Sequence, residues 1–169
     1  MLDLIRRGTV AGFVAGITVA LVVFVHDLIL MEPFATPRLL AQNLIGAPAG
    51  TEAGGSPGLS VAGGALPWVA AFLVGVRDIA FFTIAHFAVF AVLGILGAWL
   101  FSPGRWSANV ATGALYGAVA GSAVLLAGLL FFAPNFVAAP SWPLLLAANA
   151  VAGVVLVAQL TDPPEPFED

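Results

Sequence analysis

The chain has 169 residues, of which 61% are hydrophobic and only 8% are charged, and its formal net charge is −4. Ordinary soluble domains carry about 25% charged residues, so the composition predicts a protein that lies mostly in the lipid bilayer. The basic surface needed to bind nucleic acid is missing. The absence of cysteine excludes disulfides, thiolate metal sites and iron–sulfur clusters.

Four apolar segments are long enough to cross the hydrocarbon layer, which takes about 20 helical residues. They cover residues 9–31, 79–101, 109–132 and 142–160. The segments show no alternation of polar and apolar residues and are too long for barrel strands. The sequence therefore predicts an all-α fold, an integral membrane bundle of about four transmembrane helices that forms a single domain over residues 1–160.

A long outer loop, residues 32–76, is expected between the first two helices. Its middle, 46–64, is rich in Gly, Ala, Pro and Ser and is expected to be irregular. Residues 39–45 are expected to form a short interfacial helix, with Pro37 near its start and Gly46 at its end. Residues 67–76 either extend the second helix outward or lie in the interface. A fifth span over 59–76 is disfavoured because no turn separates it from residue 79.

The arginines predict the orientation in the membrane. Arg6, Arg7 and Arg105 fall on one side of the predicted bundle, and Arg38 and Arg77 fall on the other. The positive-inside rule then places both termini in the cytoplasm. We therefore expect a multi-pass protein of the bacterial inner membrane whose residues 161–169 form an acidic, Pro-rich cytoplasmic tail.

Glycines recur at a spacing of four residues in the first and third predicted helices. This spacing forms a flat groove that lets a neighbouring backbone approach closely. The second and fourth helices carry fewer glycines. The predicted helix-packing glycines are Gly8, Gly12, Gly16, Gly113, Gly117, Gly121, Gly94, Gly97 and Gly153. The chain then consists of two related helical hairpins, unless the match reflects only the abundance of Gly and Ala.

Polar side chains interrupt the apolar segments at His26, Asp27, His86 and Asn149. A polar or ionisable side chain in hydrocarbon costs roughly 3 kcal/mol. These four residues should therefore face protein or water and have partners. At about 1.5 Å of rise per residue, His26, His86 and Asn149 all fall in the same outer third of the bilayer. Helical phase places Asp27 on the face of Gly16, whereas the side chain of His26 points about 100° away.

Three hypotheses account for this polar cluster. In the first, the polar groups bond to one another and fix the register of the helices. In the second, His26 and His86 ligate a b-type haem, or a quinone uses the same His and Asp pair. In the third, a His–Asp relay moves protons or ions.

Other polar residues limit these hypotheses. In the inner half of the bilayer, a relay would have only Thr112, Tyr116, Asn109 and Gln159. A metal site built from the His and Asp residues, including Asp78, has no characteristic ligand spacing. Asp78 is expected to pair locally with Arg77 or Arg38.

The sequence contains no Gly-rich phosphate loop, no nucleophile elbow and no HExxH motif, which argues against a hydrolytic enzyme. We expect a small non-catalytic accessory or structural subunit that packs against other membrane proteins, or against a second copy, through its glycine-lined faces. One alternative is a haem- or quinone-binding membrane anchor of an electron-transfer complex. A second alternative is a small proton or ion transporter.

Overall fold

The computed structural model describes residues 1–45, 67–102, 105–132 and 141–161. All secondary-structure elements in these ranges are helical. They are α1 (Leu2–Ile29), α2 (Ala35–Ile45), α3 (Pro67–Leu100), α4 (Val110–Tyr116), the π-helix η1 (Gly117–Gly121), α5 (Ser122–Phe132) and α6 (Trp142–Thr161). The segment predicted to be irregular, 46–64, and the tail 162–169 lie outside the described residues.

Four stretches of helix are long and apolar enough to cross a membrane: Leu2–Ile29, Gly75–Leu100, Val110–Phe131 and Trp142–Thr161. The third of these is built from α4, η1 and α5, which follow one another without a break. The all-α prediction with four membrane-length helices is therefore confirmed for the described part of the chain. These four helices indicate a multi-pass membrane protein.

The helices differ from the predicted segments mainly at their starts. Helix α1 begins at Leu2 rather than near residue 9, because Arg6 and Arg7 are good helix formers although they are not apolar. Helix α3 begins at Pro67, so residues 67–76 extend the second helix outward. Proline is favoured at the first position of a helix. The short helix in the outer loop is α2, which begins at Ala35 rather than at residue 39.

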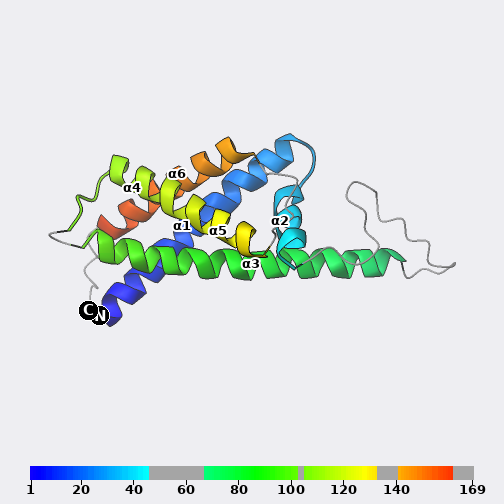
Figure 1. The fold of residues 1–169 in the computed structure, drawn as a ribbon, viewed down its shortest axis with the longest axis horizontal. Coiled ribbons are helices and arrows are strands. Elements are labelled where there is room, and N and C mark those ends of the chain that lie inside the picture. Colours follow the sequence, from blue (N-terminus) through cyan, green and yellow to red (C-terminus); the bar gives the residue numbers. More distant parts are fainter. Residues whose placement is uncertain (46–66, 103–104, 133–140, 162–169) are drawn as a thin grey trace, which may run out of the picture.

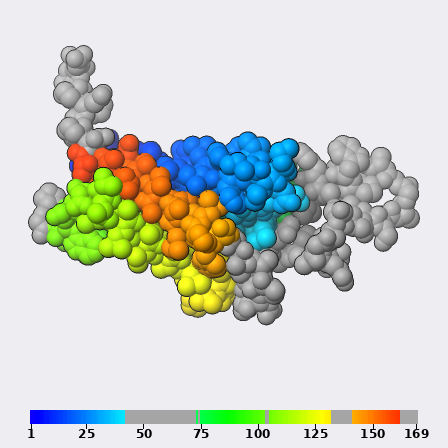
Figure 2. Space-filling view, turned by 90° about the horizontal axis from the view of Figure 1, so that it is seen from above, coloured from blue at the N-terminus to red at the C-terminus, as the bar shows by residue number. Residues whose placement is uncertain are grey.

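Helix α1 lies at the centre of the arrangement and packs on both α3 and α6 (Figure 1). Helix α6 lies between α1 and α4, and the three are side by side on one face of the molecule (Figure 2). Helix α2 folds back from the end of α1 and packs on α3. The start of α1 and the end of α6 meet at the other end of the bundle, where the Arg7 guanidinium donates to the Leu160 carbonyl at 2.8 Å.

Small residues allow α1 and α6 to approach closely. Ala11 and Ala15 of α1 are each 1% exposed, and Ala148 of α6 is completely buried in the same apolar core. Close contact between backbones through small side chains is a main source of helix association in membranes, where the hydrophobic effect does not drive helices together. Farther along the same face of α1, Val19, Val23 and finally Asp27 are also buried.

Glycine contacts join the helices in two pairs, α1 with α3 and the α4–η1 segment with α6. A Cβ atom on Gly94 would lie 2.6 Å from the Cα of Gly12, and one on Gly153 would lie 2.7 Å from the Cα of Gly117. Gly8 meets the backbone of α3 and Gly113 meets that of α6 in the same way. The same arrangement thus occurs in both pairs, while the duplication of a hairpin stays a prediction.

The remaining glycines of the predicted set have looser or different neighbours. Gly16 faces the side chains of Phe87 and Phe90, at 3.2 Å from an added Cβ. Gly97 faces Leu156 of α6 rather than α1, and Gly121 faces the side chain of Asn149. These glycines make room for side chains and not for a backbone.

Candidate functional site

A cavity of about 570 Å³ opens between the helices at the end of the bundle where α2 packs. This volume lies within the range of about 300–1,000 Å³ that is typical of small-molecule sites, which are mostly apolar with a few polar groups. All of α1, α2, α3, α5 and α6 contribute to its wall. Most lining side chains are aliphatic or aromatic, and the polar ones are Asp27, Thr36, Thr83, His86 and Asn149.

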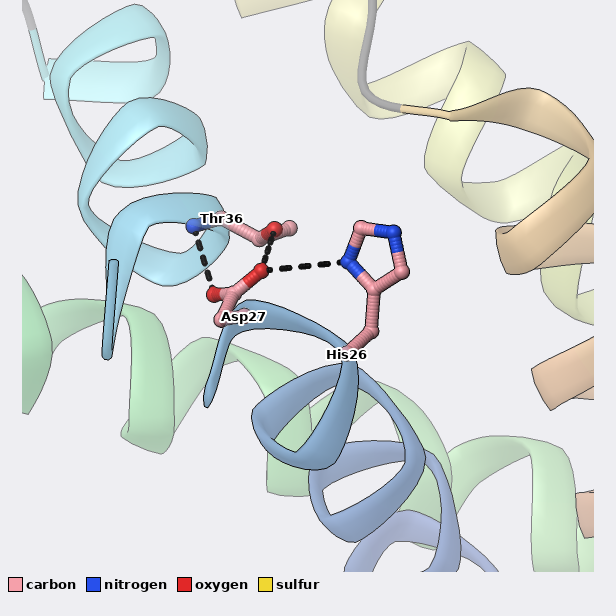
Figure 3. Close-up of polar contacts among 3 residues, drawn as sticks. All are labelled: His26, Asp27 and Thr36. Carbon is pink, nitrogen blue, oxygen red and sulfur yellow. Dashed lines mark hydrogen bonds and ion pairs between the residues drawn. The ribbon is translucent and has the colours of Figure 1, made fainter. Parts of the chain in front are cut away.

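Asp27 joins the end of α1 to the start of α2 (Figure 3). Its side chain is 2% exposed, and its two oxygens accept from the Thr36 backbone N–H at 2.9 Å and from the Thr36 hydroxyl at 2.7 Å. The first N–H groups of a helix have no partner within the helix. A carboxylate at this place satisfies one of them and interacts favourably with the helix dipole. Asp27 therefore docks α2 onto the bundle.

The turn that Asp27 spans has a strained backbone. Met31 and Phe34 have φ angles of 59° and 66°, in the left-handed region, which costs a residue with a Cβ atom roughly 1–2 kcal/mol. The Asp27 carbonyl also accepts from the Glu32 N–H at 2.9 Å. The contacts of Asp27 offset this strain and hold the tight turn between α1 and α2.

His26 is next to Asp27 but makes a weaker contact. Its Nδ1 lies 3.5 Å from the Asp27 Oδ1, yet no described residue gives this buried nitrogen a contact with hydrogen-bond geometry. The side chain is 33% exposed and is not part of the cavity wall. A distance of this size alone does not establish a hydrogen bond. His26 is therefore a neighbour of Asp27, and Thr36 is the main partner of Asp27.

His86 lies in the middle of the cavity wall contributed by α3. Its Nε2 is 2.9 Å from the carbonyl oxygen of Gly16 on α1. The ring contacts the aromatic rings of Phe82, Phe87 and Phe90, with centroid distances of 5.5, 5.3 and 4.8 Å. Because Gly16 has no side chain, the His86 ring can reach the backbone of α1. His86 thus links α3 to α1.

Asn149 occupies the opposite side of the cavity on α6. It is 5% exposed, and its Nδ2 donates to the Ser122 hydroxyl at 3.3 Å. A Cβ atom on Gly121 would lie 2.7 Å from the Asn149 Oδ1, so only glycine leaves space for the amide here. Asn149 thus connects α6 to the junction of η1 and α5.

The cavity brings together three of the four predicted residues: Asp27, His86 and Asn149 line it, whereas His26 does not. They do not form one hydrogen-bonded cluster, because each bonds to a different partner. A haem with two histidine ligands would need His26 in the wall as well. No group of three or more potential metal ligands occurs among the described residues.

Three of the four polar residues predicted for the inner half form hydrogen bonds within the protein. Asn109 and Thr112 form a capping box at the start of α4. Tyr116 donates its hydroxyl hydrogen to the Leu93 carbonyl at 2.6 Å. These contacts give no continuation of the His–Asp pair toward the other end of the bundle.

Asp78 is a buried acid whose environment the sequence did not reveal. Its side chain is completely buried, and its Oδ1 accepts from the Arg77 guanidinium at 2.7 Å. The Oδ2 has no hydrogen-bond partner within the described part of the chain. The pairing with Arg77 agrees with the predicted local pair, but its burial was not expected. The signal was helical phase: Asp78 precedes the cavity residue Phe82 by four positions on α3.

The role of Asp27 can be tested by stability. Asp27→Ala removes both contacts to Thr36 and should lower the free energy of unfolding in detergent by about 2 kcal/mol. Thr36→Val removes only the hydroxyl and should cost about half as much. Hydrogen exchange of the α2 amides should rise in both variants. His26→Ala is the matched control and should change stability by less than about 0.5 kcal/mol. Equal stability of Asp27→Ala and the unaltered chain would contradict the docking role.

No protein family, curated protein or solved structure matches the chain. The described residues define the class of the protein: a helical protein with four membrane-length helices and a mostly apolar cavity among them.

Proposed function

We propose that this multi-pass membrane protein binds a lipophilic molecule in the cavity between α1, α3, α5 and α6. The observation that carries this proposal is the wall: about 570 Å³ of space is lined almost entirely by apolar side chains, with a few polar groups at fixed places. Such a composition suits a molecule that partitions into the bilayer. A quinone, as in the alternative drawn from the sequence, belongs to this class of ligands.

Helix α2 forms part of the cavity wall, which supports a role of the cavity in ligand binding. Thr36, Pro37 and Leu40 of α2 line the cavity, and Leu40 is 3% exposed against Leu129 of α5. Helix α2 lies across one end of the site and is held there by Asp27. The cavity is thus bounded on several sides by described helices and is more than a gap between two of them.

A glycine in the wall allows a direct test. Gly128 lines the cavity, and an added Cβ atom would meet nothing within 4 Å. Gly128→Leu should fill part of the site without strain and weaken binding of farnesyl methyl ether roughly tenfold, by analogy with the effect of added carbons in apolar pockets. Binding is measured by native mass spectrometry of the detergent-solubilised protein.

The matched control is Gly75→Leu. Gly75 also lies on a membrane-length helix and has nothing within 4 Å of an added Cβ, but it does not line the cavity. This variant should bind farnesyl methyl ether as the unaltered chain does. No binding by the unaltered chain, or an equal loss in both variants, would contradict a ligand site in this cavity.

We further propose that the chain lies in a bacterial inner membrane with both termini in the cytoplasm, as an accessory subunit of a larger assembly. The contact of Arg7 with Leu160 supports placing the start of α1 and the end of α6 on one side of the membrane. Arg105 stacks on Trp99 at 3.9 Å from the ring centroid, near the end of α3. Reporter fusions at the two termini test the orientation, and copurification from native membranes tests the assembly.

A further inference from the structure

We infer that the molecule bound in the cavity is a lipophilic alcohol whose hydroxyl group donates a hydrogen bond to Nδ1 of His86; this inference rests on the ligand-binding function proposed above. The cavity wall leaves few hydrogen-bonding groups free, and these specify the ligand.

The contact with Gly16 determines which nitrogen of His86 carries a hydrogen. A carbonyl oxygen can only accept a hydrogen bond, so Nε2, at 2.9 Å, must be the donor. A charged imidazole among three phenylalanine rings is disfavoured, because no carboxylate of the described residues contacts it to compensate for lost hydration. In the neutral ring with a hydrogen on Nε2, Nδ1 is an acceptor. No partner of this Nδ1 occurs among the described residues.

The hydrogens of the other polar lining groups are largely used within the protein. The backbone and hydroxyl hydrogens of Thr36 go to Asp27. The Thr83 hydroxyl donates to the Ile79 carbonyl at 2.7 Å. Asn149 donates one amide hydrogen to Ser122. The wall therefore offers mainly acceptors, and buried acceptors are complemented by a ligand that donates.

The remainder of the wall specifies the rest of the ligand. Around His86 most lining residues are apolar, and the one polar neighbour on α3, Thr83, already donates its hydroxyl hydrogen to the Ile79 carbonyl. A carboxylate or phosphate head group would be desolvated here without a cation, since no Arg or Lys lines the cavity within the described residues. A neutral hydroxyl on an apolar body, as in an isoprenoid alcohol or a quinol, meets both requirements.

Competition between matched probes tests this inference. Farnesol and farnesyl methyl ether have the same tail, and only farnesol can donate a hydrogen bond. In native mass spectrometry of the detergent-solubilised protein, we expect farnesol to bind roughly tenfold more tightly, equivalent to about 1.4 kcal/mol. Farnesal, which can only accept, should bind no better than the ether. Decylubiquinol and decylubiquinone, tested as a second pair, show whether the quinol is preferred over the isoprenoid alcohol.

Substitutions locate the acceptor. His86→Phe keeps a ring of similar size and should abolish the preference for farnesol, so that farnesol and the ether bind equally. His86→Gln supplies a donor for Gly16 and an acceptor for the ligand, so it should keep part of the preference, and it provides the test if the phenylalanine variant does not fold. Thr83→Val, one turn away on the same helix, is the matched control and should keep the full preference.

The possible failures are distinct. If neither farnesol nor its ether binds, the proposed function fails and this inference fails with it. If both bind equally, the cavity binds lipophilic molecules but the inference about the hydroxyl is wrong. A preference for farnesal would show that the ligand head group accepts the second amide hydrogen of Asn149. Loss of the farnesol preference in Thr83→Val alone would show that the head group contacts Thr83. Either result overturns the inference.

Discussion

Replacing Gly94 by alanine is expected to lower the free energy of unfolding in detergent by about 2 kcal/mol. The new Cβ atom would lie 2.6 Å from the Cα of Gly12 on the neighbouring helix, so α1 and α3 must separate. Overpacking typically costs 1–3 kcal/mol, and we take the upper end because backbone cannot rotate away as a side chain can. The better helix propensity of alanine offsets about 1 kcal/mol of this cost. Unfolding with increasing sodium dodecyl sulfate, followed by circular dichroism, measures the effect.

Two further variants sharpen this test. Gly153→Ala disturbs the contact between α6 and η1 in the same way and should cost a similar amount. Gly75→Ala, where an added Cβ meets nothing within 4 Å, should be neutral or stabilising by up to about 1 kcal/mol. If Gly94→Ala were as stable as Gly75→Ala, the close contact between the backbones of α1 and α3 would be wrong.

Replacing Arg77 by alanine is expected to have the largest effect, a loss of about 3 kcal/mol. The Arg77 guanidinium is the partner of a carboxylate that is completely buried, with Nη2 and Oδ1 of Asp78 only 2.7 Å apart. Removing one member of a buried pair typically costs 3–5 kcal/mol, because the other charge stays buried without compensation. The lower end applies because the Arg77 side chain is itself 52% exposed. The same detergent unfolding experiment measures the loss.

A double variant separates the pair from other effects of the arginine. Arg77→Ala combined with Asp78→Asn removes the unpaired charge together with its partner and should recover most of the lost stability. Asp78→Asn alone should cost less than Arg77→Ala. Recovery of less than about 1 kcal/mol in the double variant would show that Arg77 acts through contacts other than Asp78.

Much of the fold could be predicted because it depends on local features of the sequence. The length of each apolar segment predicted its helix to within a few residues, except at the start of α1 and of α3. Helical phase placed Asp27 on the glycine face of α1, and the structure buries it on the same face as Gly8, Gly12 and Gly16. The regular spacing of glycines also pointed to the residues at which the backbones now approach most closely.

The candidate site was harder to predict, because it depends on contacts between distant segments. The partner of Asp27 is Thr36 on α2 and not a histidine, which follows from the way the chain turns at Met31 and Phe34. The similar predicted depth of His26 and His86 did not bring both into one site, since depth alone does not determine the direction of a side chain. The full burial of Asp78 was missed because its neighbour Arg77 predicted only a local pair, and helical phase was the one signal for burial.

The π-helical turn η1 has a consequence for the shape of the cavity. Each such turn contains about one residue more than an α-helical turn, and one residue corresponds to about 100° of rotation around the helix. In a regular α-helix Leu125, which follows Gly113 by 12 residues, would point about 120° away from it, and the extra residue of the π-helical turn reduces this difference to about 20°. Beyond η1, Leu125 and Leu129 line the cavity, and Leu129 packs against Leu40 of α2. One π-helical turn thus keeps the side of this helix that packs on α6 turned toward the cavity farther along the chain.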